Sequence, residues 1–361
     1  MSALLVVASL GVGGAERVVV QLANELASRM PTTLAVVDAS GPLHDLVDPT
    51  VDLVDLHAGR VRSAAGPLRR LVHARRPDLV LSSQTHVNLL TAGLAPFAPP
   101  GVRTIVREAE VRGARSRTER AIRLAHRSLY RTLDLVLASS PWMAEDLATR
   151  HRGRIAVLPN PVDVPMLRAA ATGRPSTPRP GRRFVHVGRL IAAKGTRDVL
   201  DAFTAGADGQ DQLIIVGDGP ERAGLEALVA ARGLTDRVRL VGLDPHPSHH
   251  VADADVLVNG SRTEGMPNVV LEALAIGTPV LATDDLVTLA SVADTFPPGA
   301  LRQVPRSELP AAIAATPRLV RPDAGGLRPS LLPERHAPER VVDRLLALLD
   351  HEHGDVRGTD A

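Results

Sequence analysis

VLVNGSRTEGMPNVVLEALAIGTPVLA, residues 256–282, combines a strand, a loop, a helix and a second strand. The aliphatic runs at its two ends have the length and composition of buried strands. Between them, Pro267 suits a first helical turn, where its missing N–H would be unpaired anyway, and Gly277 suits a helix end. The stretch therefore predicts a βαβ unit with a helix from about Pro267 to Ala275, and hence a parallel sheet.

The same alternation of short aliphatic runs and longer helical patterns extends over the whole chain, and it predicts an α/β fold with parallel sheets. Before residue 170 the predicted strands are 3–8, 33–37, 51–56, 78–82, 103–106, 134–138 and 155–158. After it they are 184–187, 213–216, 238–241, 255–258 and 279–282. Three of these runs begin on Asp and end near small polar residues, at the sheet edge where open α/β sheets bind ligands.

A chain of 361 residues is long for one hydrophobic core and sufficient for two. Residues 171–183, ATGRPSTPRPGRR, are rich in Pro, Gly and Arg, which is typical of a linker or an exposed loop. We therefore expect one domain at 1–170 and another at 184–333. The apolar spacing within 334–351 predicts a final helix, which we expect to pack back on the first domain.

Composition excludes several classes of protein. The chain has no cysteine, which excludes disulfides, thiolate catalysis and Cys-ligated zinc. No uninterrupted apolar run reaches about 18 residues, and the N-terminus lacks a basic leader, so we expect a cytoplasmic protein. With Lys194 as the single lysine, 41 of the 42 basic residues are arginine. Arginine is therefore weak evidence for a basic surface, and we expect no nucleic-acid partner.

Two carboxylates flank the start of the helix that the opening stretch predicts. A helix N-terminus offers unpaired backbone N–H groups and the positive end of the helix dipole to an anion. Glu264 lies in the loop before this helix and Glu272 lies inside it. We expect both to accept hydrogen bonds from hydroxyl groups of a phosphate-bearing ligand. The alternative is that Glu264 only faces the helix dipole and that Glu272 is solvated.

A second strand-to-helix loop carries two cations. The stretch FVHVGRLIAAKGTRDVLDAF, residues 184–203, predicts a strand, a Gly-Arg turn and a helix that follows Lys194. Arg189 and Lys194 are five residues apart, so both can converge on one anion at the same sheet edge. A lysine in an arginine-dominated chain favours a tight site for a compact ammonium group. The alternative is a surface lysine.

The N-terminal strand is followed by a glycine-rich loop. Gly11, Gly13 and Gly14 in VVASLGVGGAERVVV permit close approach of a ligand to the backbone, and Asp38 follows the next strand. This pattern suggests a nicotinamide-dinucleotide site. The loop lacks the G-x-G-x-x-G spacing, however, and the pattern leaves the cations and carboxylates of the second half unexplained.

Three further patterns resemble binding sites, but a structural or compositional explanation accounts for each of them. Asp253 and Asp255 form a D-x-D sequence, but Asp255 opens a strand as two other aspartates do, which indicates a structural role. The histidines of DPHPSHH, residues 244–250, suggest a metal site, yet we favour an exposed turn with no nearby acid pattern. Residues 103–131 hold nine arginines and three glutamates. That charge suits an anionic membrane or a lipid phosphate, although the arginine bias explains it equally well.

Five segments together carry a resemblance to a known family. They are G-G-A-E (13–16), L-P-N-P-V-D (158–163), G-R-L-I-A-A-K-G (188–195), V-G-D-G-P (216–220) and E-G-M-P-N-V-V-L-E-A (264–273). In this order they resemble the retaining GT-B glycosyltransferases of family 4. The resemblance implies two Rossmann-like domains facing across a cleft. It also implies transfer of a sugar from a nucleotide-diphosphate donor, with retention at the anomeric carbon and with neither metal nor cofactor.

The resemblance assigns roles to the matching positions. Arg189 and Lys194 would hold the donor diphosphate and stabilise its charge as the bond to the sugar breaks. Glu264 would contact the donor sugar, and Glu272 would bind the ribose hydroxyls. The catalytic positions implied in this way are Arg189, Lys194 and Glu264. The donor-binding positions are Gly13, Gly14, Gly188, Gly265, Met266, Pro267, Asn268 and Glu272.

The implied donor is a UDP- or GDP-linked sugar, and the implied acceptor is a lipid-linked, glycan or small-molecule hydroxyl in cell-envelope glycan or glycoconjugate synthesis. Peripheral contact with the inner membrane face would accompany a lipid-linked acceptor. Two segments depart from the family. Arg107 and Glu108 stand where many members have a histidine, and the segment after Asp284 and Asp285 lacks a Gly-Pro-x-Glu sequence. The resemblance therefore identifies neither the base on the acceptor side nor the residues at one edge of the donor site.

Three alternatives remain at this point. A sugar-nucleotide epimerase of the same fold would need no acceptor. A NAD-dependent dehydrogenase would use the glycine loop and Asp38. A binding-only relative would hold the donor without turning it over.

Overall fold

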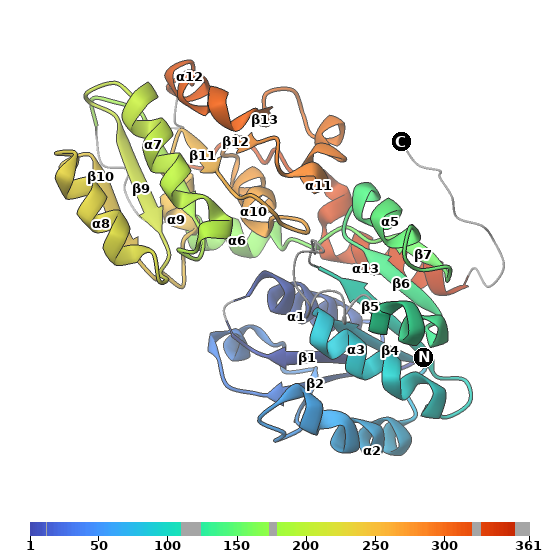
Figure 1. The fold of residues 1–361 in the computed structure, drawn as a ribbon. Coiled ribbons are helices and arrows are strands. Elements are labelled where there is room, and N and C mark those ends of the chain that lie inside the picture. Colours follow the sequence, from blue (N-terminus) through green and yellow to red (C-terminus); the bar gives the residue numbers. More distant parts are fainter. Residues whose placement is uncertain (12, 110–123, 173–178, 320–325, 351–361) are drawn as a thin grey trace. The chain divides into compact units, whose positions relative to one another are not determined.

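The computed structural model describes residues 1–11, 13–109, 124–172, 179–319 and 326–350, and the chain divides into two units (Figure 1). Unit 1 comprises residues 1–162 together with the segment from Glu334 onwards, and unit 2 comprises residues 163–333. Each unit contains one parallel β-sheet with helices against it. The α/β fold with parallel sheets is confirmed.

Unit 1 contains a seven-stranded sheet in the order β3-β2-β1-β4-β5-β6-β7. Its strands are β1 (Ala3–Ser9), β2 (Thr32–Asp38), β3 (Asp52–Asp55), β4 (Leu79–Ser83), β5 (Arg103–Glu108), β6 (Leu135–Ala138) and β7 (Ile155–Val157). Its helices are α1 (Gly14–Ala27), α2 (Ala65–Arg75), α3 (Thr85–Leu94), α5 (Pro141–Ala148) and α13 (Pro338–Asp350).

Strand β1 shows why the aliphatic runs predict this sheet. Leu5 and Val7 are buried in the cluster that includes α1 and α13, whereas Leu4 and Val6 are buried on the other face with α2 and α3. Within the sheet, Leu5 lies beside Leu81 of β4. Successive side chains of a strand point to opposite faces, so a strand that is covered on both faces needs a continuous apolar run.

Helix α13 belongs to the core of unit 1, although it follows unit 2 in the sequence. Its buried side chains include Val341, Val342 and Leu345, which share one cluster with α1 and β1. At the start of this segment the backbone N–H of Val162 donates to the carbonyl of His336 at 2.8 Å. The chain therefore leaves unit 1 after Val162 and returns to it at Glu334.

Unit 2 contains a six-stranded parallel sheet in the order β10-β9-β8-β11-β12-β13. Its strands are β8 (Arg183–Val187), β9 (Gln212–Val216), β10 (Val238–Gly242), β11 (Val256–Asn259), β12 (Val280–Thr283) and β13 (Leu301–Val304). Its helices are α6 (Val164–Ala171), α7 (Thr196–Gly206), α8 (Arg222–Ala231), α9 (Ser248–Ala252), α10 (Asn268–Ile276), α11 (Val287–Ala290) and α12 (Leu309–Ala314). The sequence did not predict β13, an edge strand whose Arg302 is exposed.

The expected domain boundary at residue 170 is wrong, because α6 belongs to unit 2. Asp163 caps this helix by accepting a hydrogen bond from the backbone N–H of Met166 at 2.9 Å. The helix packs against α9 and α10. Arg168 fixes it there by donating to the carbonyls of Ala275 at 3.2 Å and Arg328 at 2.9 Å.

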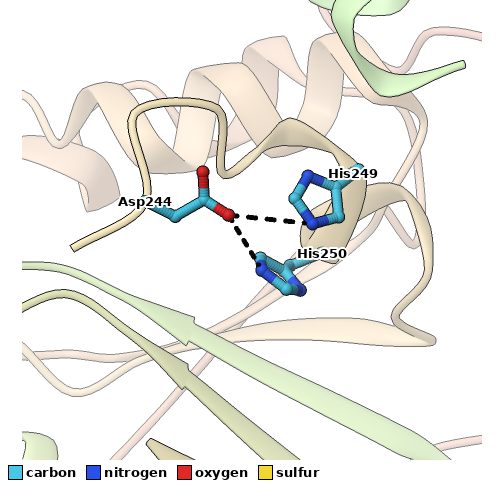
Figure 2. A group of neighbouring side chains, drawn as sticks. All are labelled: Asp244, His249 and His250. Carbon is cyan, nitrogen blue, oxygen red and sulfur yellow. Dashed lines mark hydrogen bonds and ion pairs between the residues drawn. The ribbon is translucent and has the colours of Figure 1, made fainter. Parts of the chain in front are cut away.

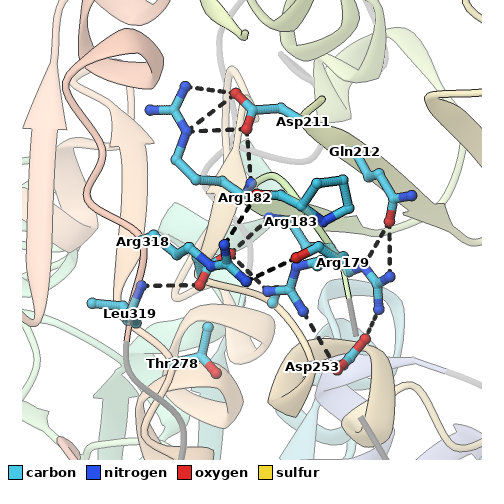
Figure 3. Close-up of polar contacts among 12 residues, drawn as sticks. Arg179, Arg182, Arg183, Asp211, Gln212, Asp253, Thr278, Arg318 and Leu319 are labelled. Carbon is cyan, nitrogen blue, oxygen red and sulfur yellow. Dashed lines mark hydrogen bonds and ion pairs between the residues drawn. The ribbon is translucent and has the colours of Figure 1, made fainter. Parts of the chain in front are cut away.

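Residues 171–183 are a connection inside unit 2, so the expectation of a linker between domains is also wrong. Residues 173–178 lie outside the described residues, but the arginines that follow them are held by ion pairs (Figure 3). Arg179 lies 2.7 Å from Asp255, and Arg182 lies 2.6 Å from Asp211. Both aspartates are buried, which gives the connection fixed anchors rather than the freedom of a linker.

Three aspartates that open strands make the same contact. Asp78 accepts from the backbone N–H of Ser2 at 2.6 Å, and Asp134 accepts from that of Thr104 at 2.6 Å. Asp255 accepts from the backbone N–H of Arg183 at 2.7 Å. Each carboxylate thus fixes the start of a neighbouring strand, and Asp255 has the structural role that its place before a strand predicts. Among the helices described, none combines the length and apolarity that crossing a bilayer requires.

Candidate functional site

The strand order of unit 2 changes direction between β8 and β11. From β8 the chain runs outward to β9 and β10, and it then returns to place β11 on the other side of β8. Such a switch point leaves a crevice at the carboxyl ends of the two strands, where open α/β sheets bind ligands. Arg189 and Lys194 follow β8, and Glu264 follows β11. The fold therefore brings these three predicted residues to the switch point.

The loops after β8 and β11 are packed backbone to backbone. Gly195 has a φ of +61°, and a Cβ atom there would lie 2.0 Å from the carbonyl oxygen of Gly260. The backbone N–H of Arg262 donates to the carbonyl of Ala193 at 2.8 Å. A side chain at Gly195 would force the loops apart, so this glycine is required for both its conformation and its close contact.

His186 holds the same two loops from beneath. Its Nδ1 lies 2.9 Å from the carbonyl oxygen of Val258, and its Nε2 lies 3.0 Å from the hydroxyl of Thr196. Because a carbonyl only accepts, Nδ1 carries the proton and Nε2 accepts from Thr196. Burial lowers the pKa of His186, which favours this neutral form. The histidine thus acts as a structural tie between β8, β11 and α7.

Lys194 and Glu264 form an ion pair across the switch point. The ammonium nitrogen lies 2.6 Å from Oε2 of Glu264, with the two side chains 28% and 13% exposed. The other carboxylate oxygen, Oε1, is buried and has no hydrogen-bond partner among the described residues. The pair therefore combines a partly exposed cation with an acceptor whose hydrogen-bonding capacity is unused.

Helix α10 begins beside this pair. Pro267 occupies its N-cap position and not its first turn, and it makes no side-chain cap hydrogen bond within the described part of the chain. Gly265 and Met266 are buried in the preceding loop, and Asn268 is the first helical residue. The half-buried Glu272 lies about one turn into the helix. The helix start keeps the anion-binding potential that the sequence predicts.

The remaining predicted residue after β8, Arg189, is exposed. Its side chain makes no hydrogen bond or ion pair with the described residues. Gly188 precedes it at the end of β8, where a Cβ atom would meet the Lys194 side chain only at 3.8 Å. The carbonyl of Gly188 is approached by Gly217, whose φ is +136°. The V-G-D-G-P segment therefore packs beneath the Gly188–Arg189 turn.

Arg306 ties further loops together, and the sequence analysis did not identify it. It follows the edge strand β13, and its Nη1 lies 2.6 Å from Asp198 and 3.0 Å from the carbonyl of Gly260. Its Nη2 lies 2.5 Å from Asp285. Asp285, at the edge where the sequence departs from the family, is therefore bound to Arg306. A basic residue after a strand is the relevant signal, but the many arginines obscure it.

Unit 1 has its own switch point, between β1 and β4. Gly13 is the N-cap of α1 and Gly14 its first residue, and a Cβ atom at Gly13 would lie 2.0 Å from the carboxylate of Glu16. That carboxylate accepts from Gln84 at 2.5 Å. Gln84 follows β4 with a φ of +77°, a strained value that is common at functional sites. Gln84 is not among the residues predicted from the sequence, in which its one signal is its place after a strand.

Asp38, the basis of the nicotinamide alternative, is exposed at the end of β2. Its carboxylate accepts from the backbone N–H of Ser40 at 3.0 Å, and this bond lowers the pKa of Asp38. This hydrogen bond, between a side chain and the backbone two residues later, is typical of a local turn.

Arg107 and Glu108 lie in a buried polar network at the end of β5. Arg107 donates to Asn160, while its Nε and Nη1 have no partner among the described residues. Burial lowers the pKa of Arg107 to about 10. Glu108 accepts from Asn88 at 3.1 Å and from Tyr130. Much of the arginine-rich stretch 103–131 that follows lies outside the described residues.

The interpretation of residues 244–250 as an exposed turn without a nearby acid is wrong for two of its histidines. His249 and His250 are each 11% exposed at the side chain, and both lie close to Asp244. The side chain of His246, in contrast, is exposed.

Two family models match this chain. Residues 12–165 match Glycosyltransferase Family 4, and residues 181–316 match Glycosyl transferases group 1.

Curated relatives match over part of their length. The lipopolysaccharide core biosynthesis glycosyltransferase LpsE of Rhizobium meliloti is 31% identical over 43% of this chain and 46% of its own. An exopolysaccharide phosphotransferase of Streptomyces coelicolor is 28% identical over 65% of this chain and 24% of its own. The chain thus spans less than half the length of either relative.

Several solved structures resemble this chain over most of its length and most of their own. Anabaena HepE, crystallised with UDP-glucose, is 20% identical and aligns with a TM-score of 0.70 over 87% of this chain and 88% of its own. At this identity the likeness concerns the fold.

Proposed function

Because the chain belongs to the group 1 glycosyltransferases, with the two-domain GT-B fold, we propose that it transfers a sugar from a nucleotide-diphosphate donor to a hydroxyl group of an acceptor. The observation that carries this proposal is the Lys194–Glu264 pair at the switch point of unit 2, beside the N-terminus of α10. These groups combine charge for a diphosphate with an acceptor for sugar hydroxyls.

Lys194, Arg189 and the N-terminus of α10 stabilise the diphosphate in this proposal. Negative charge accumulates on the leaving nucleotide diphosphate as its bond to the sugar breaks, and preorganised positive groups lower the energy of that transition state. The ammonium of Lys194 is held by Glu264, so little reorganisation is needed when the donor binds. The exposed guanidinium of Arg189 is available to the same anion. The proposal requires no side-chain nucleophile and assigns no step to a metal or cofactor.

Glu264 and Glu272 recognise hydroxyl groups in this proposal. The unused Oε1 of Glu264 accepts from a hydroxyl of the donor sugar, which supplies the hydrogen bond that this buried oxygen lacks. Glu272 binds the ribose hydroxyls from inside α10. Backbone N–H groups from Gly265 to Asn268 bind sugar or phosphate oxygens.

The glycine loop of unit 1 is a second candidate anion site in this proposal. Gly13 and Gly14 begin α1, and a helix N-terminus can bind an anion through its backbone N–H groups and dipole. Gln84 and Glu16 lie at the switch point of the same unit and supply polar groups there.

We assign the acceptor to a cell-envelope glycan or glycoconjugate and the donor to the UDP-linked sugars, with retention of anomeric configuration. The lipopolysaccharide core biosynthesis for which LpsE is named, and the UDP-glucose bound to HepE, support this assignment. Contact of the arginine-rich stretch with an anionic membrane would accompany a lipid-linked acceptor. The family matches favour transfer over the epimerase and dehydrogenase alternatives.

Ligand-induced stabilisation tests the proposal first. UDP or GDP should raise the melting temperature of the protein, while NAD should not. If the nucleotide binds at the proposed site, Lys194→Ala should lose the rise in melting temperature caused by UDP or GDP. Arg197→Ala should keep that rise. Arg197 is an exposed cation three residues away. Stabilisation by NAD alone would refute the proposal and favour the dehydrogenase.

Product analysis then separates the enzymatic alternatives. Incubation with UDP-GlcNAc should yield UDP only when an acceptor is present, and a new nucleotide sugar without acceptor would indicate an epimerase. The coupling constant of the anomeric proton in the product tests retention.

A further inference from the structure

A cluster of one carboxylate and two imidazoles lies in unit 2 on the segment that joins β10 to α9. Asp244 belongs to the loop after β10, whereas His249 and His250 belong to the short helix α9 (Figure 2). Strand β10 is at the edge of the sheet, with β9 between it and the β8–β11 switch point. The cluster is therefore distinct from the Lys194–Glu264 pair.

The three side chains present their ligand atoms to one point. Oδ2 of Asp244 lies 3.1 Å from Nε2 of His250 and 3.7 Å from Nε2 of His249. All three potential ligand atoms lie within 4.8 Å of one another. In a tetrahedral zinc site with bonds of the usual length, neighbouring ligand atoms are about 3.4 Å apart. The observed separations bracket this value.

Backbone contacts orient two of the three ligands. The backbone N–H of His246 donates to Oδ1 of Asp244 at 2.8 Å, which leaves Oδ2 directed at the imidazoles. Nδ1 of His249 lies 2.8 Å from the carbonyl oxygen of His246, so it carries a proton. Nε2 of His249 is the ring nitrogen that faces the carboxylate of Asp244. A carbonyl partner on the other ring nitrogen is typical of metal-bound histidines.

The imidazole rings of His249 and His250 lie against each other. The two imidazole centroids are 3.9 Å apart, and burial followed by His249 lowers the pKa of His250 to about 4. Arg239 also disfavours a proton there, whereas Asp244 favours one. The carboxylate and the two imidazoles bring their potential ligand atoms close together. A cation between them would convert this contact into coordination.

We propose that Asp244, His249 and His250 bind a divalent transition-metal ion, with Zn²⁺ as the best match to two nitrogen ligands and one oxygen ligand. Three protein ligands leave a fourth position for water. The ion would fasten the β10–α9 loop to α9, a helix that packs against α6 and α10. Its role is conformational, because the residues of the transfer site lie elsewhere in the sheet.

Calorimetric titration of the untagged, chelator-treated full chain with ZnCl₂ tests the proposal. One ion should bind per chain, and Co²⁺ at the same site should give the visible absorption of a tetrahedral complex. MgCl₂ should give no heat, because Mg²⁺ prefers an octahedral oxygen shell. His250→Ala and Asp244→Asn should each weaken Zn²⁺ binding at least about tenfold. The asparagine keeps the volume of the aspartate and its contact with the His246 amide.

Two matched variants exclude other histidines. His246→Ala removes an exposed imidazole of the same loop and keeps the carbonyl that orients His249, so it should leave affinity unchanged. His351 and His353 flank Glu352 in the sequence, outside the described residues, and replacing both should also have no effect. Thermal unfolding of each variant checks its fold. Absence of Zn²⁺ binding by the folded wild-type chain, or equal weakening by His246→Ala and His250→Ala, would overturn the proposal.

Discussion

Replacing Lys194 with Ala is expected to lower kcat by about 10²- to 10³-fold, because it removes a preorganised cation from the leaving diphosphate. One such donor in a preorganised site contributes about 3–4 kcal/mol to transition-state stabilisation. Lys194 is 28% exposed, which favours the lower end of this range. The KM for the donor should change less than kcat, since the charge on the diphosphate grows as the bond to the sugar breaks. Initial rates of UDP release over a range of donor concentrations measure both constants.

The same substitution has a separate effect on stability. Glu264 would keep a carboxylate that is 13% exposed, and neither of its oxygens would have a partner among the residues that the structure describes. A half-buried group left in this state costs about 1–2 kcal/mol of the free energy of unfolding. Adding Glu264→Gln to Lys194→Ala should recover much of that loss, because the unpaired charge is gone. It should not recover kcat, and this divergence separates the catalytic role of Lys194 from a structural role.

Two controls accompany this experiment. Arg197→Ala removes an exposed cation from the next helix and should leave both constants within about twofold of wild type. Circular dichroism of Lys194→Ala establishes that it is folded. The reasoning would be refuted by a folded Lys194→Ala variant that transfers sugar within threefold of the wild-type rate. It would be refuted equally by a double variant that regains both stability and kcat.

Gly195→Ala should lower the free energy of unfolding by at least about 2 kcal/mol in urea titrations, since a Cβ atom there meets a backbone carbonyl at 2.0 Å. Gly209→Ala, at a position open to solvent, should have no such effect. Burial lowers the pKa of His336 to about 4, below its value in the unfolded chain, so the native state favours the neutral imidazole. The contribution of His336 to the free energy of unfolding is therefore fully present above about pH 6.5 and is lost as the pH falls towards 4. Unit 1 should lose about 2 kcal/mol between pH 7 and pH 5, measured by fluorescence of Trp142 in α5, and a pH-independent midpoint would contradict this. Arg306→Ala should lower kcat/KM about tenfold by releasing the loops that Arg306 joins, and steady-state rates equal to wild type would argue against that role.

The strands were predictable because most of them are covered on both faces. A continuous apolar run such as Leu4 to Val7 is required when successive side chains enter different cores. Strand β13 escaped prediction because it lies at the edge of its sheet and carries the exposed Arg302. The boundary between the two units after Val162 was not predicted, for another reason. Helix α6 is placed by contacts with α9 and α10, which lie about a hundred residues away, and local composition does not contain that information.

The candidate site was predictable where residue type and strand position agreed. Lys194 and Glu264 both follow strands, and parallel connections bring the ends of those strands together. Arg306 has the same placement but is one arginine among 41. The cluster at Asp244 was misjudged because its geometry depends on which ring atoms face the carboxylate. Sequence spacing does not reveal this when two histidines are adjacent.

The return of α13 to unit 1 makes unit 2 an insertion within the first domain rather than its successor. During synthesis on the ribosome, the residues up to Val162 emerge long before the helix that covers Leu5 and Val7. The later-made domain can complete its fold while the earlier one still exposes an apolar surface. A nascent chain that stalls before residue 338 would therefore present that surface to chaperones and proteases, even with its second domain already folded.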